Sequence, residues 1–343
     1  MKKVLAFAAV VAMVLTGCVK NEVIEPEREI DFNAVNYKAQ TGRAEVYGPL
    51  AGTTYDTKEH FGAFAFHDTD AWSATDASYD PAVYMDNVEI WLNAAKWKNH
   101  TKPYFWPKTG QLSFVCYSPY AFGAGTVAAT ATKGVTFTGF TTTNDLSKQV
   151  DLMTMDVLKD QTKAGAEVEA VFKHILSQVV FTVAPKENVK DYVTDLTLDR
   201  LVLKAVKSVG NYASIDATVA NGSWNTVTTP IDYTFADTDP ATPATVLDVD
   251  HTKTDAAVVG NPAIVIPQAC ENYIVEVDYT ITYIGGAIDK LTGVQLKIST
   301  EEWEKGNKYT YNLQIGLGDE ILFTPSITTD DWTNGGDNNI AIG

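Results

Sequence analysis

The position of one cysteine predicts a covalent modification. Two lysines at positions 2 and 3 precede an apolar run over residues 4–14, and Leu15-Thr16-Gly17-Cys18 follows. This order is typical of a bacterial lipoprotein signal, in which a peptidase cuts just before a cysteine that is then acylated. The apolar run is shorter than the roughly 20 residues that a permanent membrane-spanning helix needs. We therefore expect residues 1–17 to be a signal peptide and Cys18 to be the lipidated residue.

The residues around the cysteine predict where the lipid holds the chain. Val19 is not the aspartate that retains some lipoproteins in the inner membrane. Residues 18–29 are acidic and contain a proline, a composition typical of a solvated tether. We expect a lipid-anchored protein outside the cytoplasm. The acidic tether also resembles the leader of lipoproteins that are exported to the cell surface, and this resemblance implies a position on the outer membrane, exposed at the cell surface.

Signals for catalysis, metal binding or a bound cofactor are absent from the sequence. It contains no Gly-x-Ser-x-Gly, no His-Glu-x-x-His, no phosphate-binding loop and no paired-cysteine motif. The five histidines are scattered without the spacing of metal ligands: His60, His67, His100, His174 and His251. His174 lies between Phe172 and Ile175, which favours a hydrogen-bonded core histidine. We expect no enzyme, no metal site and no cofactor.

Charge, length and cysteine content narrow the class of protein further. The formal net charge of −17 argues against binding to nucleic acid, which requires clustered basic residues. The 343 residues, 45% of them hydrophobic, are enough for two cores. Besides Cys18 the chain has only Cys116 and Cys270, far apart in strand-like segments, and we expect both to be buried thiols.

Alternating apolar and polar residues predict an all-β body. Residues 275–283 alternate strictly, Gly285-Gly286 follows, and residues 294–298 alternate again, which is the pattern of a β-hairpin. Similar short runs recur along the chain, separated by segments rich in Gly, Asp, Thr, Asn and Pro. Many short strands with such spacers are typical of a sandwich or a barrel.

One segment leaves two assignments open. Apolar residues over 168–179 also fit helical spacing, although the β-rich run over residues 179–183 favours a strand from about Ile175 onward. The polar segment 159–167 before it could connect two domains. We expect an N-terminal β-sandwich domain over residues 30–168 and a C-terminal one over residues 169–343.

The order of several landmarks resembles a known family. The landmarks are Cys18 with its acidic tether, Ile30-Asp31-Phe32, Thr41-Gly42-Arg43-Ala44, residues 61–66, Tyr104-Phe105-Trp106-Pro107, residues 112–119, Asp151-Leu152-Met153, residues 172–181 and residues 303–313. Together they resemble the fimbrillin-like proteins of Bacteroidota, which are type V pilins and their accessory lipoproteins. The resemblance covers nearly the whole chain, and no single motif in it is specific.

The resemblance implies a fold and an assembly mechanism. The fold would be two tandem transthyretin-like β-sandwiches. An N-terminal strand would complete the first sandwich until an arginine-specific protease removes it, and a terminal strand of another subunit would fill the groove that is left. Ile30, Phe32 and Ala34 would be the inward side chains of the removed strand. Arg43 would be the cleavage residue, because cutting at Arg28 would leave the strand behind.

The same resemblance suggests a donor strand and partners. Ile321, Phe323 and Ile327 would be its apolar side chains, and Pro325 is compatible with an edge strand. The partners would be other pilin subunits, identical or different, and the outer membrane through the lipid. Surface glycans or proteins of a host or of bacteria would be the targets of adhesion. In the alternative that Arg43 is merely a surface residue, the chain would be an uncleaved accessory lipoprotein.

A second alternative is a surface lipoprotein that binds glycans of a host or of bacteria and does not polymerise. Trp91, Trp97 and Trp106 lie close in the sequence, and exposed, coplanar aromatic rings can stack on sugars. Rings packed into the interior would instead favour the pilin interpretation.

Overall fold

The structure, a computed structural model, describes residues 27–36, 60–76, 78–165, 167–187, 189–215, 222–237, 245–247, 256–317 and 321–329. Cys18 and Arg43 lie outside these residues. The regular structure described is β-strand, apart from two single turns of 3₁₀-helix, η1 (Leu146–Lys148) and η2 (Val189–Asp191). The all-β class is therefore confirmed. In these ranges no helix is long and apolar enough to cross a membrane.

The helical alternative over residues 168–179 is wrong. This segment forms the strands β10 (Val168–His174) and β11 (Ser177–Pro185). Val168, Ala170 and Phe172 point into a core at every second position, each at most 2% exposed. Pairing with neighbouring strands decides the conformation here, and helical spacing of apolar residues over so short a run does not.

The N-terminal half forms one closed sheet. Its strand order is β2-β3-β4-β1-β10-β8-β5-β9, and β2 also pairs with β5, so the sheet closes on itself with β9 outside the ring. Besides β10, its members are β1 (Phe32–Asn36), β2 (Phe61–Asp68), β3 (Ala82–Asn93), β4 (Lys96–Lys98), β5 (Gln111–Ser118), β8 (Met153–Met155) and β9 (Leu158–Gln161). A cluster of buried apolar side chains fills the interior, and we call it the N-terminal core.

Strands β2 and β5 of the closed sheet are buried on both faces, which explains their almost continuous apolar sequences. In β2, Phe61, Ala63 and Ala65 belong to the N-terminal core, while Phe64 belongs to a second cluster outside the ring. The ring of Tyr117 occupies the space that a side chain at Gly62 would need, since a Cβ there would lie 2.1 Å from Cε1 of Tyr117. Only glycine fits at this position of β2.

The C-terminal half is built from two main sheets, of seven and five strands. One contains β6 (Thr126–Thr130), β7 (Gly134–Thr141), β12 (Val193–Ala213), β13 (Ser223–Ala236), β14 (Thr245–Leu247), β18 (Ile274–Tyr283) and β19 (Ile288–Lys297). The other contains β11, β15 (Ala257–Val258), β16 (Ala263–Val265), β21 (Asn307–Ile315) and β22 (Ile321–Thr329). Side chains of both sheets form one C-terminal core. A small pairing joins β17 (Gln268–Ala269) to β20 (Glu302–Trp303).

The expected hairpin over residues 275–298 is confirmed as β18 and β19. Val275, Val277, Tyr279 and Ile281 are fully buried, so the alternation in the sequence reports one core-facing side of the strand. β19 forms the outer edge of its sheet and is mostly exposed.

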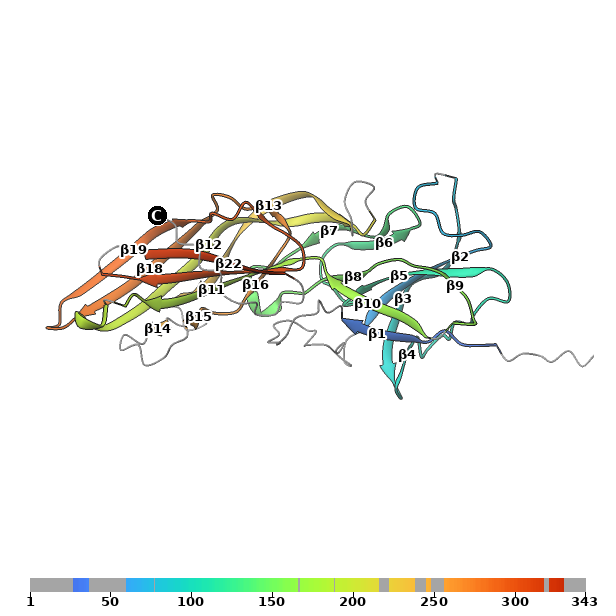
Figure 1. The fold of residues 1–343 in the computed structure, drawn as a ribbon, viewed down its shortest axis with the longest axis horizontal. Helices are drawn as coiled ribbons and strands as arrows, with labels where there is room; N and C mark the ends of the chain where they lie inside the picture. Colours follow the sequence, from blue (N-terminus) through green and yellow to red (C-terminus); the bar gives the residue numbers. More distant parts are fainter. Residues whose placement is uncertain are drawn as a thin grey trace, which may run out of the picture.

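The two halves lie end to end in an elongated molecule, with the closed sheet at one end and the two C-terminal sheets at the other (Figure 1). A third apolar cluster, the junction cluster, contains residues of both halves, among them Tyr117, Phe137, Tyr212 and Ile266. Strand β7, which precedes the expected boundary at residues 168/169, pairs with β12, which follows it. The division into two tandem transthyretin-like domains at that boundary stays a prediction.

Candidate functional site

The candidate site is the position of β1 in the closed sheet, which we call the strand slot. β1 lies between β10, to which it runs parallel with Phe32 opposite Val168, and β4, to which it runs antiparallel with Phe32 opposite Trp97. Just before β1, the amide of Ile30 donates to the carbonyl of Tyr104 at 2.8 Å. β1 thus pairs with strands that lie more than 50 residues away in the sequence.

The inward face of this segment is part of the N-terminal core. Ile30 and Phe32 are 2% exposed and Ala34 is 7% exposed. The ring of Phe32 meets those of Phe61 and Phe114 edge-on, with centroids 5.5 Å and 5.7 Å apart. Burying a side chain such as Ile or Phe stabilises a fold by about 1.5–3 kcal/mol. An empty slot would therefore expose an apolar groove and two unpaired strand edges.

The outward face of the same segment is acidic and meets two lysines of β4. Nζ of Lys96 lies 3.0 Å from Oδ2 of Asp31 and 2.8 Å from Oε1 of Glu167. Hydrogen bonds to Glu167 and then to Asp31 raise the pKa of Lys96 to about 12. Lys98 forms an ion pair with Glu29. The carboxylates of Glu29 and Asp31 thus alternate with the buried side chains of Ile30 and Phe32.

A basic residue fixes the start of the segment. The guanidinium of Arg28 donates hydrogen bonds of 2.6 Å to the carbonyls of Lys163 and Gly165. Arg28, the less favoured cleavage residue of the sequence analysis, is itself an exposed residue.

The sequence analysis missed the lysines of the slot, although a signal for them is present. Glu29-Ile30-Asp31-Phe32 alternates acidic and apolar residues, and Lys96-Trp97-Lys98 alternates basic and apolar residues in the same way. Complementary patterns of this kind favour neighbouring strands, because opposite charges on the same face of a strand pair attract. Here both ion pairs run diagonally across the two strands.

The expected donor segment is β22, an edge strand of the C-terminal half. It pairs with β21 from Asn307 opposite Thr329 to Ile315 opposite Ile321, and with no further strand in the described part of the chain. Phe323 is 9% exposed and stacks on Tyr311 with ring centroids 5.4 Å apart. Ile321 is half-buried, and Ile327 is 49% exposed.

The tryptophans considered for glycan binding do not form a shared surface. Trp97 and Trp106 are 8% and 7% exposed and belong to the N-terminal core. Trp91 is half-buried, and its ring lies against His60, with centroids 5.8 Å apart, and against His100, at 5.3 Å. This arrangement offers no row of coplanar exposed rings.

The remaining residues of chemical interest are held inside the fold. Nδ1 of His174 lies 2.8 Å from Oδ2 of Asp151, and both side chains are almost fully buried. Cys116 and Cys270 are free and buried, as the sequence predicts, and burial raises the pKa of both thiols. Within the described ranges, no three His, Cys, Asp or Glu side chains are placed to hold a metal ion.

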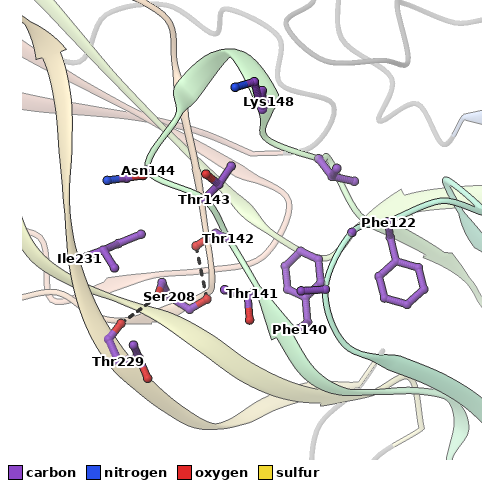
Figure 2. A pocket seen from close by; sticks show the side chains of 13 residues that line it. Phe122, Phe140, Thr141, Thr142, Thr143, Asn144, Lys148, Ser208, Thr229 and Ile231 are labelled. Atoms are coloured by element: carbon purple, nitrogen blue, oxygen red, sulfur yellow. Dashed lines mark hydrogen bonds between the residues drawn. The ribbon is translucent and has the colours of Figure 1, made fainter.

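A cavity of about 550 Å³ lies where η1 meets strands β7, β12 and β13 (Figure 2). Its wall combines the rings of Phe122 and Phe140 with several hydroxyl groups. The polar groups pair with one another: Thr142 donates its amide to the carbonyl of Ser208 at 2.9 Å, and Ser208 donates its hydroxyl to Thr229 at 2.8 Å. The cavity is therefore a less specific candidate than the strand slot.

Comparison with solved structures identifies the class of fold. A fimbrial protein from Bacteroides vulgatus is similar with a TM-score of 0.65 and 19% identity, covering 88% of this chain and 99% of that one. A candidate cell adhesion protein from Bacteroides ovatus is similar with a TM-score of 0.50 and 13% identity, covering 90% of this chain and 100% of that one. No curated protein matches the chain.

The fimbrillin-like family matches residues 43–332, which is most of the chain. The chain therefore belongs to the fimbrillin-like family, and the resemblance found in the sequence is confirmed. The matched range starts at Arg43, so β1 lies before it.

Proposed function

We propose that this protein is a lipid-anchored fimbrial subunit, or a fimbria-associated adhesin component, that joins other subunits by strand exchange. In this proposal Cys18 is acylated, the lipid holds the chain in the outer membrane, and cleavage after Arg43 frees the N-terminal strand. A terminal strand of another subunit then enters the strand slot. The role is structural and adhesive, without catalysis.

The observation that carries the proposal is the position of β1 within the closed sheet. β1 is a short, terminal segment, yet it completes both the backbone pairing of the ring and the N-terminal core. Arg43 follows β1 and precedes β2 in the sequence, so a cut there separates β1 from the rest of the chain. An incoming strand would restore main-chain pairing and bury apolar surface, at about 25 cal/mol per Å².

The donor side of the exchange has a structural requirement. β22 is paired with β21 along its whole length, and its Phe323 covers Tyr311 and Phe181. Donating β22 to another subunit therefore means leaving β21. As an edge strand, β22 can leave without breaking a second row of pairing.

The alternative of a non-polymerising, glycan-binding surface lipoprotein has no specific support from the geometry, because Trp97 and Trp106 are buried. The proposal can be tested with purified chain lacking the signal peptide. We expect cleavage by an arginine-specific protease to produce a ladder of heat-stable oligomers. Arg43→Ala should stay a folded monomer, while the control Arg28→Ala should still form the ladder.

The donor is tested in the same assay. Removing the residues after Asp319 should block the ladder, whereas Ile288→Ser on the exposed edge strand β19 should not. If cleaved wild-type protein remains monomeric at high concentration, polymerisation by this chain alone is ruled out.

A further inference from the structure

We infer that Lys96 and Lys98 form a charge-selective latch on the outer face of the strand slot, favouring an occupant with two carboxylates spaced two residues apart. The inference rests on the proposed strand exchange and adds a specificity to it. The latch holds the resident acidic strand in preference to an uncharged strand.

The geometry gives each lysine a partner on the resident segment. Lys96 pairs with Asp31, and Lys98 pairs with Glu29. Since successive side chains of a strand point to opposite faces, these two carboxylates share the outward face, with Ile30 pointing inward between them. The two lysines have the same spacing on β4, on either side of the buried Trp97.

The two pairs differ in how far they are sheltered. The side chains of Lys98 and Glu29 are 23% and 26% exposed, so salt screens this pair less than it screens fully exposed pairs. Lys96 is 47% exposed and Asp31 is 22% exposed, so their pair is screened more and contributes less. Among the described residues, Glu29 is the only carboxylate paired with Lys98. Lys96 also pairs with Glu167. Departure of the resident strand therefore leaves Lys98 without its carboxylate partner, while Lys96 keeps one.

The expected donor strand does not offer the same chemistry. β22 reads Ile-Leu-Phe-Thr-Pro-Ser-Ile-Thr-Thr and contains no acidic residue. A copy of β22 in the slot would cover the apolar groove, but its nine residues would leave Lys98 without a carboxylate. The latch therefore slows the replacement of the resident strand and makes the exchange sensitive to salt.

Peptide competition tests the latch. The protein is the chain without its signal peptide, cut after Arg43 by an arginine-specific protease. Three labelled peptides are compared at low salt: residues 27–36, the same peptide with Glu29→Gln and Asp31→Asn, and residues 321–329. From modest ion-pair strengths, we expect the acidic peptide to bind roughly tenfold more tightly than its amide version. The preference should fall towards one in the Lys96→Met/Lys98→Met double variant and at high salt, but not in the control Lys108→Met, at an exposed lysine.

The outcomes separate the latch from strand exchange itself. Equal binding of the acidic and amide peptides to the wild-type slot would overturn the latch and leave strand exchange intact. Binding of the peptide of residues 321–329 as tight as that of the acidic peptide would also overturn it. If the slot takes up no peptide at all, the proposed strand exchange fails.

If the slot takes up no peptide, the uncut chain still tests whether the lysines hold the N-terminal segment in place. Hydrogen exchange at the amide of Ile30 reports how often the N-terminal segment opens, because this amide is bonded to the carbonyl of Tyr104. We expect roughly threefold faster exchange in Lys98→Met than in Lys108→Met at low salt, in line with one modest ion pair. Equal exchange in the two variants would contradict the latch.

Discussion

The ring of Phe32 meets the ring of Phe61 edge-on, with centroids 5.5 Å apart and planes inclined by 78°. Phe32 belongs to β1, the first strand of the chain that the structure describes, and Phe61 is the first residue of β2. The two strands are separated in the sequence by residues 37–60. A segment that the proposed mechanism removes is therefore part of the buried N-terminal core. Its loss is costly unless another strand takes its place.

We expect Phe32→Ala to destabilise the uncleaved chain strongly. The side chain is 2% exposed and packs on two other rings, and removing a buried Phe side chain costs about 3–5 kcal/mol. The free energy of unfolding, measured in urea, checks this. Asn33→Ala, on the exposed face of the same strand, should change it by less than about 0.5 kcal/mol. Equal effects of the two substitutions would show that β1 is not part of the stable core.

The buried pair of His174 and Asp151 should stabilise the N-terminal half, where His174 ends β10 and Asp151 precedes β8. Asp151→Ala would remove the carboxylate from a buried ring nitrogen of His174, and leaving a buried polar group without such a partner costs about 1–3 kcal/mol, so the free energy of unfolding should fall by an amount of that order. The exposed pair of Lys173 and Asp156 is the matched control, and Asp156→Ala should cost less than about 1 kcal/mol. A double-mutant cycle with His174→Ala would reveal little coupling energy if the pair is unimportant.

The protein should lose stability in alkali. Burial raises the pKa of the Cys270 thiol to about 12 from an ordinary value of 9.0, and the pKa values of Tyr212 and Tyr233 to about 12 from 10.0. The folded chain then keeps protons that the unfolded chain releases. The stabilisation is complete below about pH 9 and is lost as the pH rises towards 12, by at most about 1.4 kcal/mol per group and pH unit.

Urea unfolding at pH 8, 10 and 11 measures this loss. Tyr233→Phe should make the decline between pH 10 and 11 shallower, because one titrating group is gone. Tyr192→Phe, at a residue that is 57% exposed, should leave the decline unchanged. A free energy of unfolding that stays constant up to pH 11 would contradict the burial of these groups.

The two remaining thiols should be inert in the folded state. Cys116 and Cys270 are both fully buried, and the thiolate is the form that reacts. With chain lacking the signal peptide and Cys18, we expect almost no reaction with a thiol reagent at pH 8. Both thiols should react once urea unfolds the protein. Rapid reaction of either thiol in native protein would show that its core opens far more readily than the packing suggests.

The sequence predicts most of the fold because the strands follow simple patterns. The alternation in residues 275–283 reports one buried face, and Ile30, Phe32 and Ala34 alternate in the same way. The pattern fails at β10, where only the partner strands β1 and β8 distinguish an extended segment from a helix. Pairing over long sequence distances is invisible to local periodicity.

The candidate site was less predictable than the fold. The inward residues of β1 could be named from the sequence through a family resemblance, but their neighbours could not. The sequence of Lys96-Trp97-Lys98 complements that of Glu29-Ile30-Asp31-Phe32, but the match identifies the two lysines as neighbours of β1 only once β4 is known to lie beside it. The same holds for the interleaving of the halves, because nothing local in residues 134–141 indicates that they pair with β12.

The central claim is that β1 leaves the subunit when polymers form. The most direct test is the intact mass of subunits released from fimbriae that have been sheared from cells and dissociated in denaturant. We predict a chain that starts at Ala44 and no chain that retains residues 27–36. Polymer subunits whose mass includes these residues and begins at Cys18 would contradict the account, because the strand slot would then still be filled by its own strand.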